Sequence, residues 1–290
     1  MPRPLRITSW DIENLAPFLA EDVLAEDSDR PLRDLLKSLQ SPDVLCLQEI
    51  RVRPQDTRLI ERMQRALTGY RCHYSLNHDA RNAGYRGGRA YGVATWTRKG
   101  LDAQAYVPEW DREGRVLMTL LPALRWLVVN VYAVNGTAKP YWDHERNGWF
   151  EDRHAFKRRF VEKLGGELAA LQEQDLQLIL IGDWNVSRTK IDTFPRLRTE
   201  APHALARKDF NENFMPRLDV VDAFRTLHPD AREYTWFNRR TRGGRLDAAR
   251  VDFALVSRSL IERVIDADIA QDAPPSSRSD HVPLWITLRR

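Results

Sequence analysis

The chain has 290 residues, of which 42% are hydrophobic, enough to bury the core of one large domain or of two smaller ones. It has no apolar run near the roughly 18 residues of a membrane span and no secretory leader, and its two cysteines make a poor disulfide framework. No linker divides it, so we expect one cytoplasmic domain over residues 1–290. Lys and Arg (45) outnumber Asp and Glu (41), which suits an anionic partner.

Short β-branched runs alternate with charged amphipathic stretches along the chain. The apolar runs predict strands at 5–10, 43–48, 91–96, 115–121, 126–132, 176–183, 250–257 and 282–288. Apolar residues spaced three and four apart predict helices at 31–40, 57–67 and 152–174, the last broken or kinked at Gly165 and Gly166. Because some strands follow directly on others, we expect an α/β fold with a mixed sheet, or with two packed sheets and helices outside.

Acidic residues recur in or beside the apolar runs. An isolated buried carboxylate is costly to ionise, so buried charges are normally paired or bound to a metal. At any single position a helix cap, a turn or a structural ion pair is the simpler interpretation. The recurrence in one chain instead favours a shared oxygen-rich site, built from Asp11, Glu13, Glu49, Asp183, Asp252 and Asp280, with His281 beside the last.

Such oxygen ligands suit a hard cation such as Mg²⁺, which keeps water and substrate phosphate oxygens in its remaining positions. The sequence has no HExxH motif, no CxxC pair and no histidine cluster, which disfavours zinc. It also lacks the GxxxxGK[ST] phosphate loop and the GxSxG nucleophile elbow. Nucleoside triphosphate hydrolysis and serine hydrolase chemistry are therefore unsupported.

The stretch SWDIENL places Asp11 and Glu13 two residues apart at the end of the first predicted strand. In an extended segment such side chains share a face, and two carboxylates that close repel each other. We therefore expect a positive group beside them, and a bound cation would supply it.

Six motifs occur in order: SPDVLCLQEI, NVYAVNG, LILIGDWNV, VVDAFRTLHPDAREYTWFNRR, ARVDFALVS and SRSDHVPLW. Together they resemble the endonuclease/exonuclease/phosphatase superfamily, specifically its exonuclease III and abasic-site endonuclease branch, over residues 7–288. The resemblance implies a four-layered α/β sandwich, in which two mixed β-sheets pack face to face with helices outside. It also implies a divalent-metal site at the strand ends, for Mg²⁺ or Mn²⁺.

The resemblance further implies a role for each matching residue. Glu49 would be the principal metal ligand, with Glu13, Asp11 and Asp280 close by. Asp183 would activate the attacking water, and His281 would hydrogen-bond a phosphate oxygen as charge develops. Asn185 would hold the water or the phosphate, and Asp252 would fix the tautomer of His281. Tyr132 and Asn135 would contact the scissile phosphate.

The YAVN segment favours DNA as the substrate, because the resemblance places tyrosine and asparagine here in the abasic-endonuclease branch, although Val134 replaces the usual proline. We expect a monomer acting on duplex DNA with abasic sites, other damage or 3′ ends. DNA contacts are expected from Trp236, Phe237, Arg250 and the loop arginines Arg239 and Arg240. The alternatives are a phosphoesterase with a non-DNA substrate and a catalytically weakened DNA-binding member.

Asp11 departs from the family pattern, which usually has asparagine at this position. The substitution adds a negative charge of almost the same shape beside Glu13, Glu49 and Asp280. The extra charge should either tighten the hold on a cation or raise a neighbouring pKa.

Overall fold

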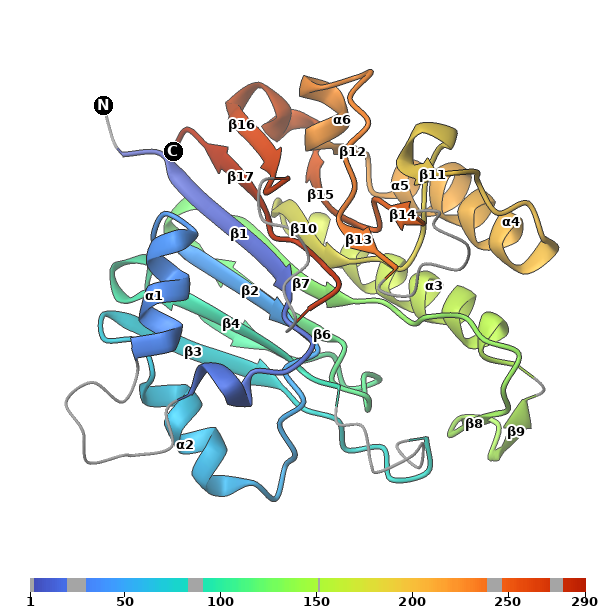
Figure 1. Ribbon diagram of the computed structural model, residues 1–290, viewed down its shortest axis with the longest axis horizontal. Coiled ribbons are helices and arrows are strands. Elements are labelled where there is room, and N and C mark those ends of the chain that lie inside the picture. The colour runs from blue at the N-terminus through green and yellow to red at the C-terminus, as the bar shows by residue number, and fades with distance from the viewer. Residues whose placement is uncertain (1–2, 20–29, 83–90, 151, 239–246, 272–278) are drawn as a thin grey trace.

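Two six-stranded sheets dominate the computed structural model, which describes residues 3–19, 30–82, 91–150, 152–238, 247–271 and 279–290 (Figure 1). The first sheet contains, in order, β16 (Val264–Ile269), β17 (Leu284–Leu288), β1 (Leu5–Asp11), β2 (Val44–Gln48), β4 (Val93–Arg98) and β3 (Tyr70–Ser75). The second contains β12 (Val220–Asp222), β15 (Asp252–Ser257), β10 (Gln177–Asp183), β7 (Trp126–Tyr132), β6 (Val116–Leu121) and β5 (Gln104–Tyr106). All eight predicted strands are present.

Both sheets are mixed, because β1 pairs parallel with β2 and β7 pairs parallel with β10 among antiparallel neighbours. A small sheet joins β11 (Thr193–Phe194), β14 (Ala248–Ala249) and β13 (Trp236–Phe237), and β8 (Tyr141–Asp143) forms a hairpin with β9 (Gly148–Phe150). The helices are α1 (Arg30–Ser38), α2 (Thr57–Arg65), α3 (Arg153–Gln172), α4 (Ala201–Lys208), α5 (Met215–Arg217) and α6 (Ala223–Leu227). A π-helical turn spans Asp209–Phe214, and 3₁₀ turns span Ala16–Phe18, Lys99–Leu101, Pro122–Leu124, Lys190–Asp192 and Arg258–Arg263.

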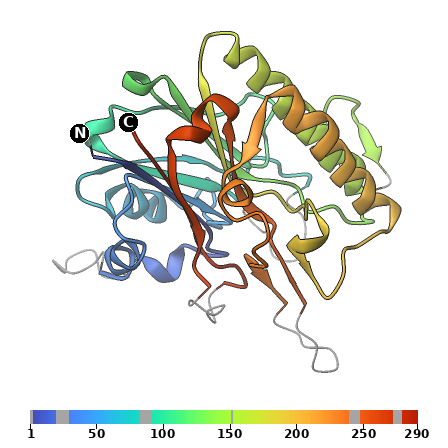
Figure 2. The same cartoon turned by 90° about the horizontal axis from the view of Figure 1, so that it is seen from above.

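Three hydrophobic clusters show how the layers stack. One lies between the sheets and includes Ile7 of β1, Val128 of β7 and Ile179 of β10. The other two lie outside, where α1 and α2 cover the first sheet and α3 covers the second (Figure 2). Because side chains alternate along a strand, Val128 faces the inner cluster and Val129 the outer one, so β7 is buried on both faces. The predicted four-layered α/β sandwich is confirmed.

The predicted break in the third helix is wrong, since α3 runs unbroken through Gly165 and Gly166. A β-carbon on Gly165 would lie 3.2 Å from the ring of Phe214, which is tighter than ordinary van der Waals contact. Glycine here allows the helix to approach the π-helical turn closely, so its role is packing and not termination.

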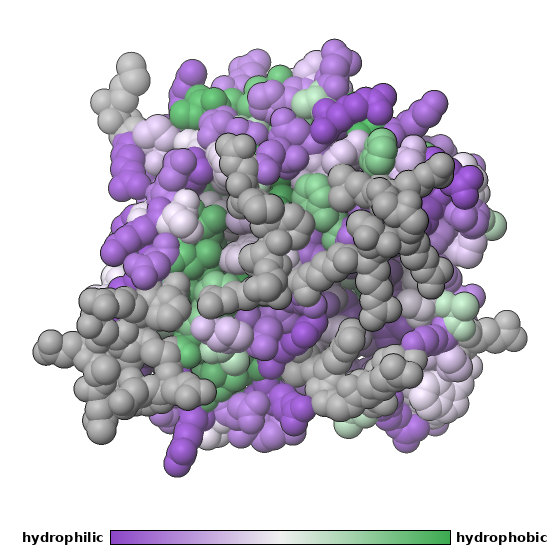
Figure 3. Space-filling model, in the orientation of Figure 1, coloured by the Kyte–Doolittle hydropathy of each residue, from purple (hydrophilic) through white to green (hydrophobic). Residues whose placement is uncertain are grey.

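The surface visible in Figure 3 is mostly hydrophilic, with smaller apolar patches between charged side chains. Within the described part of the chain, no helix combines the length and apolarity needed to cross a membrane.

Candidate active site

The carboxyl ends of β1, β2, β7 and β10 meet at one edge of the sandwich and carry the predicted residues there. Strand pairing places Asp11 beside Gln48 in the first sheet. In the second sheet Asp183 lies opposite both Tyr132 and Asp252. Parallel strands end at the same edge, so residues far apart in sequence gather around one point.

The segment before β17 brings His281 to this edge. Because β17 is antiparallel to β1, its amino end lies at the carboxyl end of β1. The Ser279 hydroxyl donates to the backbone oxygen of Asp11 at 2.6 Å, and the Trp10 indole donates to the backbone oxygen of His281 at 2.9 Å. These bonds hold the histidine over the end of the first strand.

A cavity of about 350 Å³ opens at this edge. Most of the predicted site residues line it: Asp11, Glu13, Glu49, Tyr132, Asn135, Asp183, Asn185, Trp236, Asp280 and His281.

His281 and Asp252 form a buried pair. The Nδ1–H of His281 donates to Oδ2 of Asp252 at 2.7 Å. Burial alone lowers the pKa of His281, but the charges of Asp252 and Asp11 outweigh it and hold the pKa well above its usual 6.5. The neighbouring carboxylates therefore favour the protonated imidazole, and the side chain lines the cavity.

Asp183 is held by Asn185. The backbone N–H of Asn185 donates to Oδ1 at 2.8 Å, and its side-chain amide donates to Oδ2 at 2.6 Å. Burial, followed by the charge of Asp252, raises the pKa of Asp183 to about 8.

The backbone reaches these positions by turns and not by extended strand. Asn185 has φ 51° and Glu13 has φ 62°, both in the left-handed region that non-glycine residues rarely adopt. The expectation that Asp11 and Glu13 share a face of an extended segment is therefore wrong: β1 ends at Asp11, and the N–H of Glu13 turns back to Oδ1 of Asp11 at 3.0 Å.

The positive group expected beside the acids is Arg51, which the sequence reasoning missed. Its guanidinium donates to Oε2 of Glu49 at 2.7 Å and to Oε1 of Glu13 at 3.3 Å. The Tyr132 hydroxyl donates to the other oxygen of Glu49. Arg51 stands only two residues after Glu49, so a search for cations near the acids would have found it.

Asp11, Asp183 and His281 each offer a ligand atom within 4.8 Å of the others. Burial, followed by the charge of Glu49, raises the pKa of Asp11 well above 3.8. These carboxylates repel one another in a buried setting, and a divalent cation between them would relieve that repulsion. Carboxylate oxygens are the donors that Mg²⁺ prefers, so the residues present fit the ion that the family implies.

Two other predicted ligands have different partners. Glu13 is bound by Arg51, and Asp280 accepts a hydrogen bond from the Trp236 indole at 3.0 Å. Both line the cavity but lie outside the close group. The geometry therefore favours Asp11 over them as a ligand, while Glu49, which also lies outside the close group and is bound by Arg51 and Tyr132, stays a prediction.

Two predicted DNA contacts are corrected by the structure. Arg250 is 1% exposed, with its guanidinium donating to Asp192 and Asp222, so it cannot face a ligand in the cavity. Phe237 packs against the cluster between the sheets and does not line the cavity, although its neighbour Trp236 does. The loop arginines Arg239 and Arg240 fall outside the described residues.

The sequence reasoning also missed five basic side chains that line the cavity: Lys157, Arg196, Arg198, His203 and Arg207. The Lys157 ammonium donates to the backbone oxygen of Asn185 at 2.6 Å, and burial lowers the pKa of this lysine to about 8. These residues lie on α3 and on the segment through α4, where no apolar run or motif marks them.

Comparison with known proteins agrees with this geometry. The chain is 26% identical to an exodeoxyribonuclease III from Haemophilus influenzae over 263 residues, 86% of this chain and 90% of the relative. It is also 26% identical to an exodeoxyribonuclease from Bacillus subtilis over 293 residues, 98% of this chain and 99% of the relative. The crystal structure of an AP endonuclease from Leishmania major has the same fold, with a TM-score of 0.72 and 23% identity, covering 99% of this chain and 88% of that one.

The family model described as "Endonuclease/Exonuclease/phosphatase family" matches residues 9–281, from the end of β1 to the histidine of the buried pair. The match spans nearly the whole chain and includes every strand end that lines the cavity. The chain therefore belongs to the endonuclease/exonuclease/phosphatase family.

Proposed function

We propose that the chain is a Mg²⁺-dependent DNA repair nuclease that hydrolyses phosphodiester bonds. The observation that carries the proposal is the presence of a protonated His281, held by Asp252, and an amide-held Asp183 close together in one cavity. Such a site offers a proton donor and a base to one phosphate. The names of the two exodeoxyribonuclease relatives support DNA as the substrate.

The chemistry needs no covalent intermediate. Asp183 takes a proton from water, whose oxygen bonds to phosphorus while the bond between phosphorus and the ester oxygen breaks, and the leaving oxygen takes a proton from solvent. A base with a pKa of about 8 works efficiently near neutral pH, and Asn185 keeps its carboxylate oriented. His281 donates its Nε2–H to a phosphoryl oxygen as negative charge develops.

Asp11 and Glu49 would hold Mg²⁺, which supplies a Lewis acid that neutralises charge on the phosphate. Tyr132 donates to Glu49 and so fixes that carboxylate. Asn135 also lines the cavity and would contact the phosphate.

The preferred substrate is proposed to be duplex DNA with an abasic site or a 3′ end. Trp236 lines the cavity together with the small side chains of Ala249 and Val251, which leaves room for an extruded sugar.

Incubating the protein and Mg²⁺ with duplexes that carry an abasic analogue, a nick or blunt ends tests the proposal. We expect cleavage of at least one duplex, lost on chelation and restored by Mg²⁺. A small phosphoester serves as the control substrate. Hydrolysis of that compound alone would indicate a non-DNA phosphoesterase, and binding without cleavage of any duplex would indicate a weakened DNA-binding member.

Asp11→Asn should weaken metal binding, because it removes one carboxylate from the close group. We expect the Mg²⁺ concentration for half-maximal cleavage to rise by about tenfold, a loss of about 1.4 kcal/mol. Titration of Mg²⁺ and Mn²⁺ against cleavage, with calorimetry of Mg²⁺ binding, measures the change.

Glu13→Gln is the matched control for this substitution, since Glu13 pairs with Arg51 outside the close group. Its curves should follow those of the unchanged protein. Identical titrations for Asp11→Asn and the unchanged protein would show that the extra charge is silent.

A further inference from the structure

The β8–β9 hairpin has two faces of different character. Along β8, Tyr141 and Asp143 are buried and the intervening Trp142 is not, as expected where side chains alternate across a strand. Trp142 pairs across the hairpin with Trp149 of β9. One face is therefore anchored to the protein, and the other carries two tryptophans.

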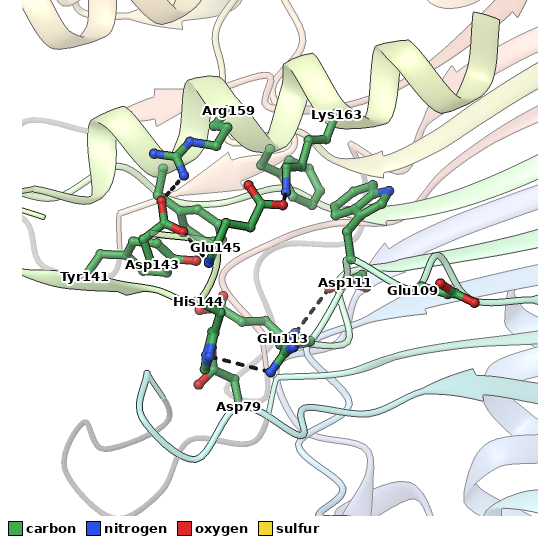
Figure 4. A pocket seen from close by; sticks show the side chains of 14 residues that line it. Asp79, Glu109, Asp111, Glu113, Tyr141, Asp143, His144, Glu145, Arg159 and Lys163 are labelled. Atoms are coloured by element: carbon green, nitrogen blue, oxygen red, sulfur yellow. Dashed lines mark hydrogen bonds and ion pairs between the residues drawn. The ribbon is translucent and has the colours of Figure 1, made fainter. Parts of the chain in front are cut away.

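The anchored face and α3 both line a cavity of about 150 Å³ (Figure 4). Arg159 and Lys163 of α3 reach Asp143 and Glu145 of the hairpin and pair with them. Tyr141 stacks on Phe156 of α3, with ring centroids 3.8 Å apart. These hairpin acids therefore have cationic partners on α3, which anchor the hairpin to that helix.

The other face is a rigid aromatic surface. Trp149 is 62% exposed, and its ring meets that of Trp142 edge to face at 5.5 Å. The guanidinium of Arg81 lies 4.0 Å above the Trp142 ring. The Asn82 side chain exchanges two hydrogen bonds of 2.9 Å with the Trp142 backbone, which fixes the strand beneath the rings. We call Arg81, Trp142 and Trp149 the platform.

A chain of buried charges connects the hairpin to the active site. Arg115 donates to the backbone oxygen of Tyr132 at 3.2 Å and also pairs with Glu113. Glu113 in turn pairs with Arg153, the first residue of α3, at 3.2 Å. Arg115 and Glu113 are 2% and 3% exposed, and α3 in turn pairs with the hairpin through Arg159 and Lys163. The hairpin is therefore linked, through α3, to the strand end that carries Tyr132.

We propose that the platform stacks an unpaired nucleobase of the DNA strand whose phosphodiester occupies the active site. This rests on the proposed nuclease function. Any base offers a π-face to an exposed indole, so such stacking tolerates all sequences. Arg81 adds a positive charge that suits the neighbouring phosphates.

The charges of the hairpin favour a nucleic acid over a second copy of the chain. The exposed Arg81 beside it is positive, while the exposed Glu145 of the hairpin is already bound by Lys163. Two such surfaces would repel each other, whereas a phosphate backbone would be attracted.

Equilibrium binding without divalent metal, so that nothing is cleaved, tests the platform. One duplex carries a short single-stranded 3′ overhang, and the other has the same paired sequence with blunt ends. We expect Trp149→Ala to weaken binding to the overhang duplex by about tenfold and to leave the blunt duplex unchanged. Trp149→Phe should keep most of the affinity, because it preserves a ring. Leu227→Ala, which removes another exposed apolar side chain on α6 away from the hairpin, is the matched control and should bind as the unchanged protein (Figure 1).

The outcomes separate the platform from the proposed function. Unchanged overhang binding by Trp149→Ala, in a protein that still cleaves DNA with Mg²⁺, overturns the platform alone. An equal loss on both duplexes also overturns it, as does a loss of self-association in sedimentation without any change in DNA binding. Failure of the unchanged protein to bind or cleave any DNA overturns both.

Discussion

Asp183→Asn is expected to lower the rate of DNA cleavage by about 10²–10⁴-fold while leaving the fold intact, because an amide of the same shape cannot accept a proton from water. Burial already raises the pKa of Asp183 to about 8, so the ionised form is unfavourable in the folded protein. Removing that charge should not lower the free energy of unfolding. Single-turnover cleavage and thermal unfolding measure the two effects.

His281→Ala is the companion change, since it removes the proton donor beside Asp183 and should also abolish most turnover. Asp219→Asn, on an exposed acid paired with Arg258, is the control and should keep full activity. Near-native turnover of either site variant, in protein that remains folded, would show that the assigned roles are wrong.

Arg250→Met is expected to lower the free energy of unfolding by about 3–5 kcal/mol, the usual effect of removing one partner from a buried ion pair. Its guanidinium lies 2.8 Å from Asp192 and 2.7 Å from Asp222, which are themselves 0% and 4% exposed. Their remaining partners, Arg225 and Arg188, would compensate for only part of the loss. Urea unfolding measures the change.

The control for this variant is Arg258→Met, on an arginine whose side chain is 63% exposed and pairs with Asp219. An exposed pair contributes about 0–1 kcal/mol, so this variant should unfold almost as the unchanged protein does. Unchanged stability of Arg250→Met with weaker DNA binding would restore the DNA-contact interpretation of Arg250.

The same cluster predicts a dependence on pH. Burial alone would raise the pKa of Asp192 and Asp222, but the Arg250 guanidinium outweighs it and holds both below 3.8. Their stabilising contribution is therefore complete above 3.8 and is lost as the pH falls through the lowered pKa values. Without Arg250 the pKa values rise, so acid unfolding should begin at a higher pH.

Apolar runs predicted eight strands because each of these strands is buried on at least one face, but they missed β3 and β16, two six-residue edge strands that polar side chains interrupt. The β8–β9 hairpin and β5 were not predicted, because a strand of three residues is too short to show a periodic hydrophobic pattern. The glycine pair in α3 was misinterpreted for a related reason. Gly165 allows close packing against Phe214, which is remote in sequence. Burial against a residue that is remote in sequence produces no local sequence pattern.

The acidic residues of the site could be predicted because they lie at strand ends that converge. The basic residues that contact the site could not be predicted in this way. Arg51 and Lys157 reach the cavity from a turn and a helix, where cations usually face solvent. Arg250 follows two small alanines of β14, and nothing in that neighbourhood distinguishes a buried guanidinium from one that contacts DNA.

The place of β17 in the first sheet, between β1 and β16, has a consequence for biosynthesis. The ribosome makes β1 long before its antiparallel partner, and the histidine of the site emerges only with that partner. A nascent chain that ends before residue 279 already contains Asp11, Glu49 and Asp183 but has no proton donor to work with them. Hydrolytic competence would then arrive together with closure of the sheet, so partly made chains would be unable to cut the nucleic acid around them.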